Sequence, residues 1–205
     1  MPDSTPPLSK KALASQRMRR KIIEVTIEIL GSQGYTALTA SRLSQQAGIS
    51  KGALYHHFAN LDDVRLNALS FLLSLFFEAD KTEHFSSFDD YLAASGDLIF
   101  RRIKQQPLAI KALYAFIFQA LVDDSVKRQI QDMVTYTLDE YAEAIKHYCP
   151  HLPAQRLDQA VLIIDAYFGG AVLHWFLLND EAACLASWQL FRNMLTNYLQ
   201  TGETT

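Results

Sequence analysis

Apolar residues recur along most of this chain at the three- and four-residue spacing of amphipathic helices. Proline, asparagine and aspartate residues separate these periodic segments, and no run shows the strict alternation of a strand. The predicted helices cover residues 15–32, two short segments within 39–58, and then 64–79, 88–104, 107–121, 125–148, 153–179 and 181–199. The pattern therefore predicts an all-α fold of about nine helices, and 205 residues with 49% hydrophobic content can bury a full core.

The segment Thr39–Phe58 has the pattern of two short helices joined by a tight turn. Thr39 and Ser50 are good N-cap residues, because their hydroxyls accept hydrogen bonds from the first turn of a helix. Gly48 can adopt the positive φ that ends the first helix. One small core shared by both helices is predicted from the apolar positions Leu43, Ala47, Ala53, Leu54 and Phe58. Polar residues near the start of the second helix face outward, as in a helix-turn-helix that enters the major groove of DNA.

This stretch resembles the TetR family of bacterial one-component regulators. The family signature is a Thr, three residues, an aliphatic residue and then Ala-Gly-Val-Ser-Lys-Gly-x-Leu-Tyr-x-His-Phe. The resemblance covers residues 17–65, about a quarter of the chain. Ser44 and Leu61 depart from the pattern, since the family usually has Ala and Lys at these positions. The resemblance implies a three-helix DNA-binding unit that is followed by a larger helical domain for effector binding and dimerisation.

The residues expected to bind DNA surround the second helix of this motif. They are Thr39, Ser50, Lys51, Gly52, Tyr55, His56 and His57. We expect Lys51 and Tyr55 to hold phosphates, and Ser50, Gly52, His56 and His57 to lie at or near base edges. Glycine at position 52 would allow a close approach of the backbone.

Basic residues also crowd into the segment before the first apolar stripe: Lys10, Lys11, Arg17, Arg19, Arg20 and Lys21. They have two interpretations, an arm along the DNA backbone or a solvated helix end. Residues 1–65 hold nine Lys and Arg against five Asp and Glu, a net charge of +4, whereas the remainder carries −7. A positively charged N-terminal region joined to a negatively charged remainder suits a protein of which one end approaches phosphates.

The segment Ala160–Leu178 is apolar almost throughout. We predict a soluble helix rather than a membrane span, because Asp165 lies near its middle and His174 follows. Such a helix must be covered on two sides: one stripe contains Val161, Ile164, Phe168 and Trp175, the other Ile163, Tyr167, Gly170, His174 and Leu177. The last helix adds a stripe of Ala186, Leu190, Met194 and Tyr198. The resemblance implies that these two helices pair with their copies in a four-helix dimer bundle.

Aromatic residues cluster in the larger domain, and most of them are expected to be core. The family keeps an effector pocket between the connector helix 64–79 and the helices of this domain. On that basis the candidate ligand-binding residues are Phe71, Phe116, Gln119, Met133, Phe168, His174 and Trp175. Because these side chains offer few unpaired charges, an apolar or aromatic small molecule is expected rather than a highly charged one.

No phosphate-binding loop, zinc motif or nucleophile elbow occurs in the chain, so an enzyme is not expected, nor a cofactor. His56 and His57 point about 100° apart on a helix and are poor partners for one metal ion. No apolar leader follows the first residues, which favours a cytoplasmic protein, and Cys149 and Cys184 are expected to be free thiols.

The predicted organisation is a flexible tail over residues 1–9, a helix-turn-helix domain over 10–60, and an effector-binding and dimerisation domain over 61–205. The predicted function is a ligand-responsive transcriptional regulator, a repressor that binds a palindromic operator as a homodimer and leaves it when a small molecule binds. Two alternatives stay open. One is an orphan DNA-binding regulator without a ligand; the other is an all-α carrier or enzyme that retains a helix-turn-helix.

Overall fold

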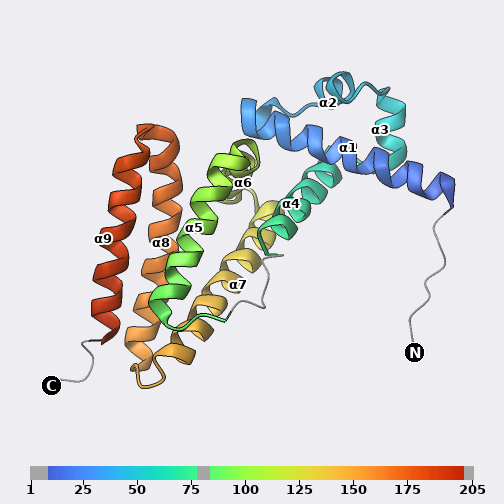
Figure 1. Ribbon diagram of the computed structural model, residues 1–205. Helices are drawn as coiled ribbons and strands as arrows, with labels where there is room; N and C mark the ends of the chain where they lie inside the picture. Colours follow the sequence, from blue (N-terminus) through green and yellow to red (C-terminus); the bar gives the residue numbers. More distant parts are fainter. Residues whose placement is uncertain (1–8, 78–83, 201–205) are drawn as a thin grey trace, which may run out of the picture. The chain divides into compact units, whose positions relative to one another are not determined.

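The computed structural model describes residues 9–77 and 84–200 (Figure 1). These residues form nine α-helices and one short 3-10 helix, and none of them lies in a strand, which confirms the predicted all-α class. The elements are α1 (Lys10–Gln33), η1 (Tyr35–Ala37), α2 (Ala40–Ala47), α3 (Lys51–His57), α4 (Leu61–Phe77), α5 (Phe88–Gln105), α6 (Pro107–Ala120), α7 (Asp124–Tyr148), α8 (Ala154–Leu178) and α9 (Glu181–Gln200). Apart from Ser9, the predicted tail lies outside the described residues.

Packing divides the chain into two compact units. The first contains α1 to α4, α6 and the beginning of α7 as far as Ile130; the second contains α5, the rest of α7, α8 and α9. These units group the helices differently from the predicted ranges 10–60 and 61–205, because α4 and α6 both pack on α1. The division of those two ranges by function stays a prediction.

The helices of the first unit begin where side-chain caps are available. Thr39 Oγ1 accepts a hydrogen bond from Arg42 N at 3.2 Å, and Ser50 Oγ accepts one from Ala53 N at 3.0 Å. Gly48 has φ 65° and ends α2 in the left-handed conformation. These observations confirm the caps and the turn predicted for the helix-turn-helix.

The helix α1 begins five residues earlier than predicted. Ser9 is its N-cap and accepts a hydrogen bond from Ala12 N at 3.2 Å, so the helix starts at Lys10 rather than Ser15. The first turns carry mostly exposed side chains, and they therefore give no apolar periodicity by which the sequence could reveal them. Gly34, with φ 86°, follows the last helical residue.

α6 packs closely against the C-terminal part of α1. A Cβ placed on Gly31 would lie 2.2 Å from the carbonyl oxygen of Leu108, so the two backbones touch at this point. Further along α6, the fully buried Phe116 meets Tyr35 edge to face, with ring centroids 5.6 Å apart. The sequence pattern suggested α4 as the connector to the DNA-binding helices, and the structure adds α6 as a second element fastened to them.

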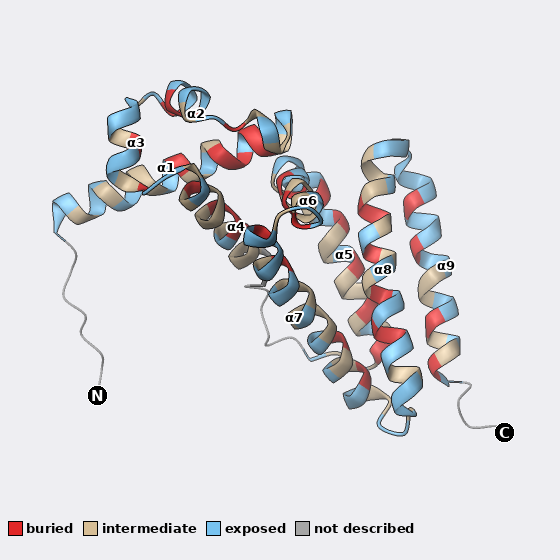
Figure 2. Cartoon of the chain, turned by 180° about the vertical axis from the view of Figure 1, so that it is seen from behind, coloured by how far each residue is buried: buried red, intermediate tan, exposed pale blue. Residues whose placement is uncertain are grey.

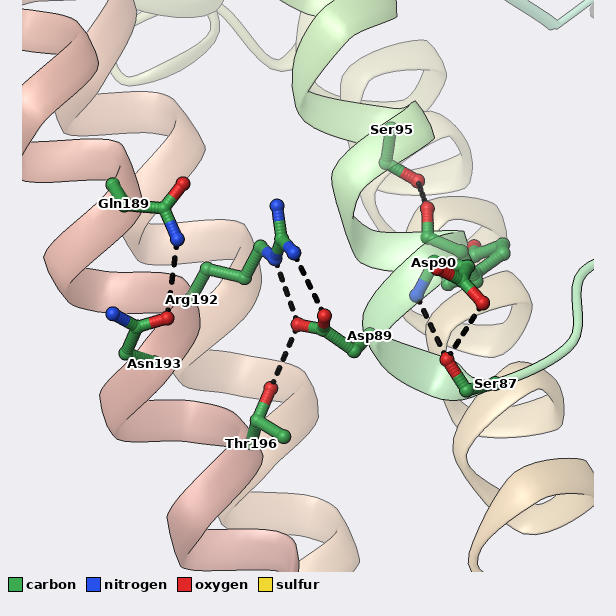
Figure 3. A network of polar contacts seen from close by, with 9 residues as sticks. Ser87, Asp89, Asp90, Ser95, Gln189, Arg192, Asn193 and Thr196 are labelled. Atoms are coloured by element: carbon green, nitrogen blue, oxygen red, sulfur yellow. Dashed lines mark hydrogen bonds and ion pairs between the residues drawn. The ribbon is translucent and has the colours of Figure 1, made fainter.

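In the second unit, α5 is joined to α9 by a polar network (Figure 3). Arg192 donates two hydrogen bonds of 2.7 Å to the carboxylate of Asp89, and Thr196 Oγ1 donates a third at 3.1 Å. Higher up, the ring of Trp188 occupies the space beside Gly96, where an added Cβ would lie 2.4 Å from it. α5 and α9 therefore form one packed layer of this unit.

Figure 2 shows exposed residues along both α8 and α9, and several of these residues are apolar. The predicted core stripe of α8 is buried at Val161, Ile164 and Phe168, whereas Ile163 and Leu177 are 52% and 76% exposed. On α9, Leu190 and Met194 are 62% and 63% exposed. Among the described helices, α8 alone is long and apolar enough to cross a membrane by length and composition, which is weak evidence for a span because the core helix of a soluble protein passes the same test.

Candidate nucleic-acid interface

The candidate DNA-binding surface lies on α3, because this helix buries one side and exposes the other. Leu54 is fully buried between α3 and its neighbours, and Phe58 is only 2% exposed. Lys51, Tyr55 and His56 are exposed on the opposite side. This arrangement places a cation, a phenol and an imidazole along one short, capped helix, which is the set of groups that contact phosphates and base edges.

The hydroxyls of Thr39 and Ser50 serve as helix caps and still lie at the surface. A hydroxyl that accepts one bond from the backbone keeps its own proton free for donation to a phosphate. Gly52 is exposed, and a Cβ there would make only an ordinary contact of 3.8 Å with Ser50 Oγ. The space around Gly52 is therefore open on the side where a nucleic acid would approach.

His57 differs from the other candidate DNA-binding residues, because its ring lies against α1. Its Nδ1 is 3.5 Å from Ser15 Oγ, and the residue is half-buried. Burial, then the neighbouring His56 and the Arg19 guanidinium, lower the pKa of the His57 ring below its ordinary value. The half-buried His57 ring therefore lies against α1, whereas His56 is exposed.

The basic segment belongs to the helix α1 and is not an extended arm. Arg20 lies 2.6 Å from Glu24 and stacks over the ring of Phe71, with its Cζ 4.0 Å from the ring centroid. Arg19 is half-buried and donates hydrogen bonds to residues of α3 and α4. Five cations of this segment have exposed side chains: Lys10, Lys11, Arg17, Arg20 and Lys21.

One further cation near the motif was missed by the sequence pattern. Arg42 is exposed on the first turn of α2, and its Nη1 donates a 3.0 Å hydrogen bond to the Ala37 carbonyl. An arginine at the start of α2 is well placed for a phosphate, since helix N-termini in these motifs approach the DNA backbone. Its place beside the cap residue Thr39 was the available signal in the sequence.

The candidate ligand-binding residues fall into both compact units. The first unit holds Phe71, Phe116 and Gln119, and the second holds Met133, Phe168, His174 and Trp175. Phe116 is fully buried and packs on Tyr35, while Gln119 Nε2 donates to Asp123 at 3.2 Å.

Within the second unit, two of the candidates belong to one aromatic cluster. Phe168 lies 5.0 Å from Trp188 between ring centroids, Trp188 lies 6.3 Å from Phe100, and Phe100 lies 5.5 Å from Trp175. His174 is exposed on α8 and lies outside this cluster. In the described part of the chain, no group of three or more His, Cys, Asp or Glu side chains could hold a metal ion.

Comparisons with known proteins agree with this geometry. Residues 22–66 match the family model described as bacterial regulatory proteins, tetR family. The biofilm operon icaADBC HTH-type negative transcriptional regulator IcaR of Staphylococcus epidermidis is 25% identical over 152 residues, which are 72% of this chain and 78% of IcaR.

Solved structures with the same fold cover nearly the whole chain. A TetR family regulator from Agrobacterium tumefaciens aligns with a TM-score of 0.75 and 17% identity, over 89% of this chain and 98% of its own. A transcriptional regulator from Saccharomonospora viridis in complex with choline aligns with a TM-score of 0.74 and 16% identity, over 91% and 97%. The matched helix-turn-helix, the regulator relatives and the shared all-α fold lead to one conclusion: residues 22–66 form a DNA-binding domain of the TetR type, in a chain that is similar to TetR-family transcriptional regulators over most of its length.

Proposed function

We propose that this protein is a homodimeric repressor that binds a palindromic operator and leaves it when a small molecule binds. The observation that carries the proposal is the exposed face of α3, where Lys51, Tyr55 and His56 stand on a helix capped by Ser50 and anchored by the buried Leu54. Such a face suits the major groove, because its side chains reach outward from a rigid, packed helix.

The residues of this face have different proposed roles. Lys51 and Tyr55 bind phosphates and set the position of α3 along the duplex. His56 and the open backbone at Gly52 lie closest to the base edges and confer sequence preference. His57, which is turned toward α1, contributes through the position of the helix rather than through a base contact.

Dimerisation is supported by the apolar surface of α8 and α9. The exposed side chains of Ile163, Leu177, Leu190 and Met194 would lose contact with water if the two helices packed against their copies. A two-fold dimer places its recognition helices about 34 Å apart, one turn of DNA, and so reads two inverted half-sites. Residues 61–205 are proposed to provide this interface together with the effector site.

Repression is supported by one similar protein, and control by a small molecule is supported by another. IcaR is described as a negative regulator, and the Saccharomonospora regulator binds choline. For this chain we propose an apolar or aromatic effector that reaches some of the seven candidate ligand-binding residues. Because α6 is fastened to α1 through the Gly31 contact, a ligand that displaces α6 would also displace the helix-turn-helix.

The direct test is selection of bound fragments from random DNA, followed by titration of the selected operator. Lys51→Ala is expected to weaken binding to every sequence and to reduce the slope of log affinity against log salt by about one unit, as the loss of one phosphate contact does. Lys146→Ala removes the same charge from the exposed surface of α7 and serves as the control. An unchanged affinity and slope for a folded Lys51→Ala variant would contradict the proposed DNA-binding face.

The dimer is tested by sedimentation of the wild type and of Gly170→Arg. No atom lies within 4 Å of a Cβ placed on Gly170, so the subunit can accept the new side chain, whereas a helix packed from a second copy cannot. We expect the variant to be monomeric and to bind the operator weakly. A wild type that sediments as a monomer at micromolar concentration would contradict the proposal.

A further inference from the structure

We propose that Arg19 is a positioning residue that fastens the C-terminal end of α3 to α4. The inference rests on the proposed role of α3 in reading DNA. Arg19 lies on α1, so this third helix holds α3 and α4 in register. Its task would be to fix the direction of the recognition helix, without any contact to the nucleic acid.

The first half of this contact is at the end of α3. A helix leaves its last carbonyl groups without intrahelical partners, and cations near them are stabilising. Nη1 of Arg19 donates a hydrogen bond to the His57 carbonyl oxygen. The guanidinium also lies over the ring of Phe58, with Cζ 4.3 Å from the centroid, and this ring is itself 2% exposed. Arg19 therefore holds both the last carbonyl of α3 and the apolar residue that follows it.

The second half is on α4, where Nη2 of Arg19 donates to Asn67 Oδ1 at 3.1 Å. The amide of Asn67 cannot turn freely, because its Nδ2 donates to the Asp63 carbonyl at 2.7 Å and to Asp63 Oδ1 at 2.8 Å. The other carboxylate oxygen, Asp63 Oδ2, accepts a 2.9 Å hydrogen bond from Ala59 N.

These contacts form a closed ring of hydrogen bonds and covalent chain. It runs from the end of α3 through Arg19 to Asn67, then through Asp63 back to Ala59, two residues after His57. The short connection between α3 and α4 is therefore held from both sides. A change in the tilt of α4 must therefore also move α3, because the hydrogen bonds prevent the connection between the two helices from rotating independently.

This arrangement separates Arg19 from its basic neighbours on α1. Arg17 is exposed and is available to a phosphate. Arg19 is half-buried, uses two donor groups in hydrogen bonds within the protein, and stacks its guanidinium on the ring of Phe58. Loss of a phosphate contact lowers the salt dependence of binding, whereas loss of a positioning contact lowers affinity at the same salt dependence. The two roles are thus distinguishable by one titration series.

The experiment compares Arg19→Met with the charge-matched control Arg17→Met, using the selected operator at several salt concentrations. We expect Arg19→Met to lose about tenfold in specific affinity, the size of one charge-assisted hydrogen bond, with an unchanged salt slope and unchanged binding to unrelated DNA. Arg19→Lys, which keeps the charge but cannot span both acceptors, should recover only part of the loss. A reduced salt slope with equal losses on all DNA would make Arg19 a phosphate contact and overturn the inference.

A second measurement needs no DNA, and so it decides the inference even if no operator is found. Hydrogen exchange of the amides from Leu54 to Phe58 is expected to be about tenfold faster in Arg19→Met and in Asn67→Leu than in the wild type. The double variant should exchange no faster than the worse single variant, because both changes break the same ring. Unchanged exchange in both single variants would overturn the inference. A wild type that selects no operator would instead contradict the proposed function.

Discussion

The contact between Gly31 and Leu108 predicts that an alanine at position 31 destabilises the protein. In the interior of a helix, Gly→Ala ordinarily stabilises by about 1 kcal/mol, because alanine is the better helix former. Here the new Cβ would lie 2.2 Å from the Leu108 carbonyl oxygen and 2.9 Å from its carbonyl carbon. These are backbone atoms of α6, so the clash cannot be relieved by a side-chain rotation, and α6 must move as a whole.

Overpacking of this kind costs about 1–3 kcal/mol and occasionally more. After the gain in helix propensity is subtracted, we expect Gly31→Ala to lower the free energy of unfolding by up to about 2 kcal/mol. For a chain of this size, each kcal/mol corresponds to about 2–4 °C in the thermal midpoint. Because α6 is displaced from α1 in this variant, operator affinity should also change, although no base contact is altered.

The assay is urea unfolding followed by circular dichroism, with Gly52→Ala as the matched control. A Cβ on Gly52 lies 3.8 Å from Ser50 Oγ, an ordinary contact, so the same substitution should leave stability equal or slightly higher. If Gly31→Ala were as stable as the control, the close packing of α6 on α1 would be refuted.

Three further predictions concern charges and caps. The Arg192 guanidinium, hydrogen-bonded to Asp89, lowers the pKa of that carboxyl below its ordinary value near 4. The ion pair therefore stabilises the fold by about 1 kcal/mol after solvent screening above pH 4, and this stabilisation is lost on further acidification. Asp89→Asn should be less stable than the wild type at neutral pH and should approach it in acid-unfolding curves at lower pH. Burial raises the pKa of Asp165, so its charged form destabilises the fold. Asp165→Asn should therefore raise the thermal midpoint at neutral pH and give no gain below about pH 4. Ser50→Ala removes the 3.0 Å cap on Ala53 N and should cost about 1 kcal/mol in urea unfolding, with weaker operator binding.

Helix positions could be predicted from the sequence because the stop and start signals of this chain are local. Thr39 and Ser50 cap the helices expected from them, and Gly48 has the positive φ expected at the end of α2. The cap and its helix lie within four residues of each other, so no tertiary information is needed. The exposed side of α3 could be predicted for the same reason, since burial of Leu54 fixes which side of this helix faces outward.

Contacts between distant residues could not be predicted in this way. Arg19 looks like its basic neighbours in sequence, and its role depends on carbonyl and amide groups 38 and 48 residues away. The side on which α6 packs was equally hidden, because an almost wholly apolar helix gives no stripe from which to choose a face. Gly31 was the one local hint, since a glycine inside a helix often marks a close approach of another backbone.

The candidate ligand-binding residues mark the limit of pattern reading. Aromatic side chains gave the list, but burial separates its members: Phe116 has no exposed surface, whereas His174 is exposed. Core packing and ligand contact require the same residue types, so composition cannot divide them. Their assignment to an effector site stays a proposal.

The exposed apolar side chains of α8 and α9 would make the stability and the DNA binding of this protein depend on its concentration. If they are covered only when two copies meet, dilution lowers the unfolding midpoint, and Tm values measured at different concentrations describe different equilibria. The same mass action would make operator occupancy rise with roughly the square of subunit concentration where dimers are scarce. A twofold change in gene dosage would then alter repression by more than twofold, a sensitivity set by Leu190, Met194 and their neighbours rather than by any residue that touches DNA.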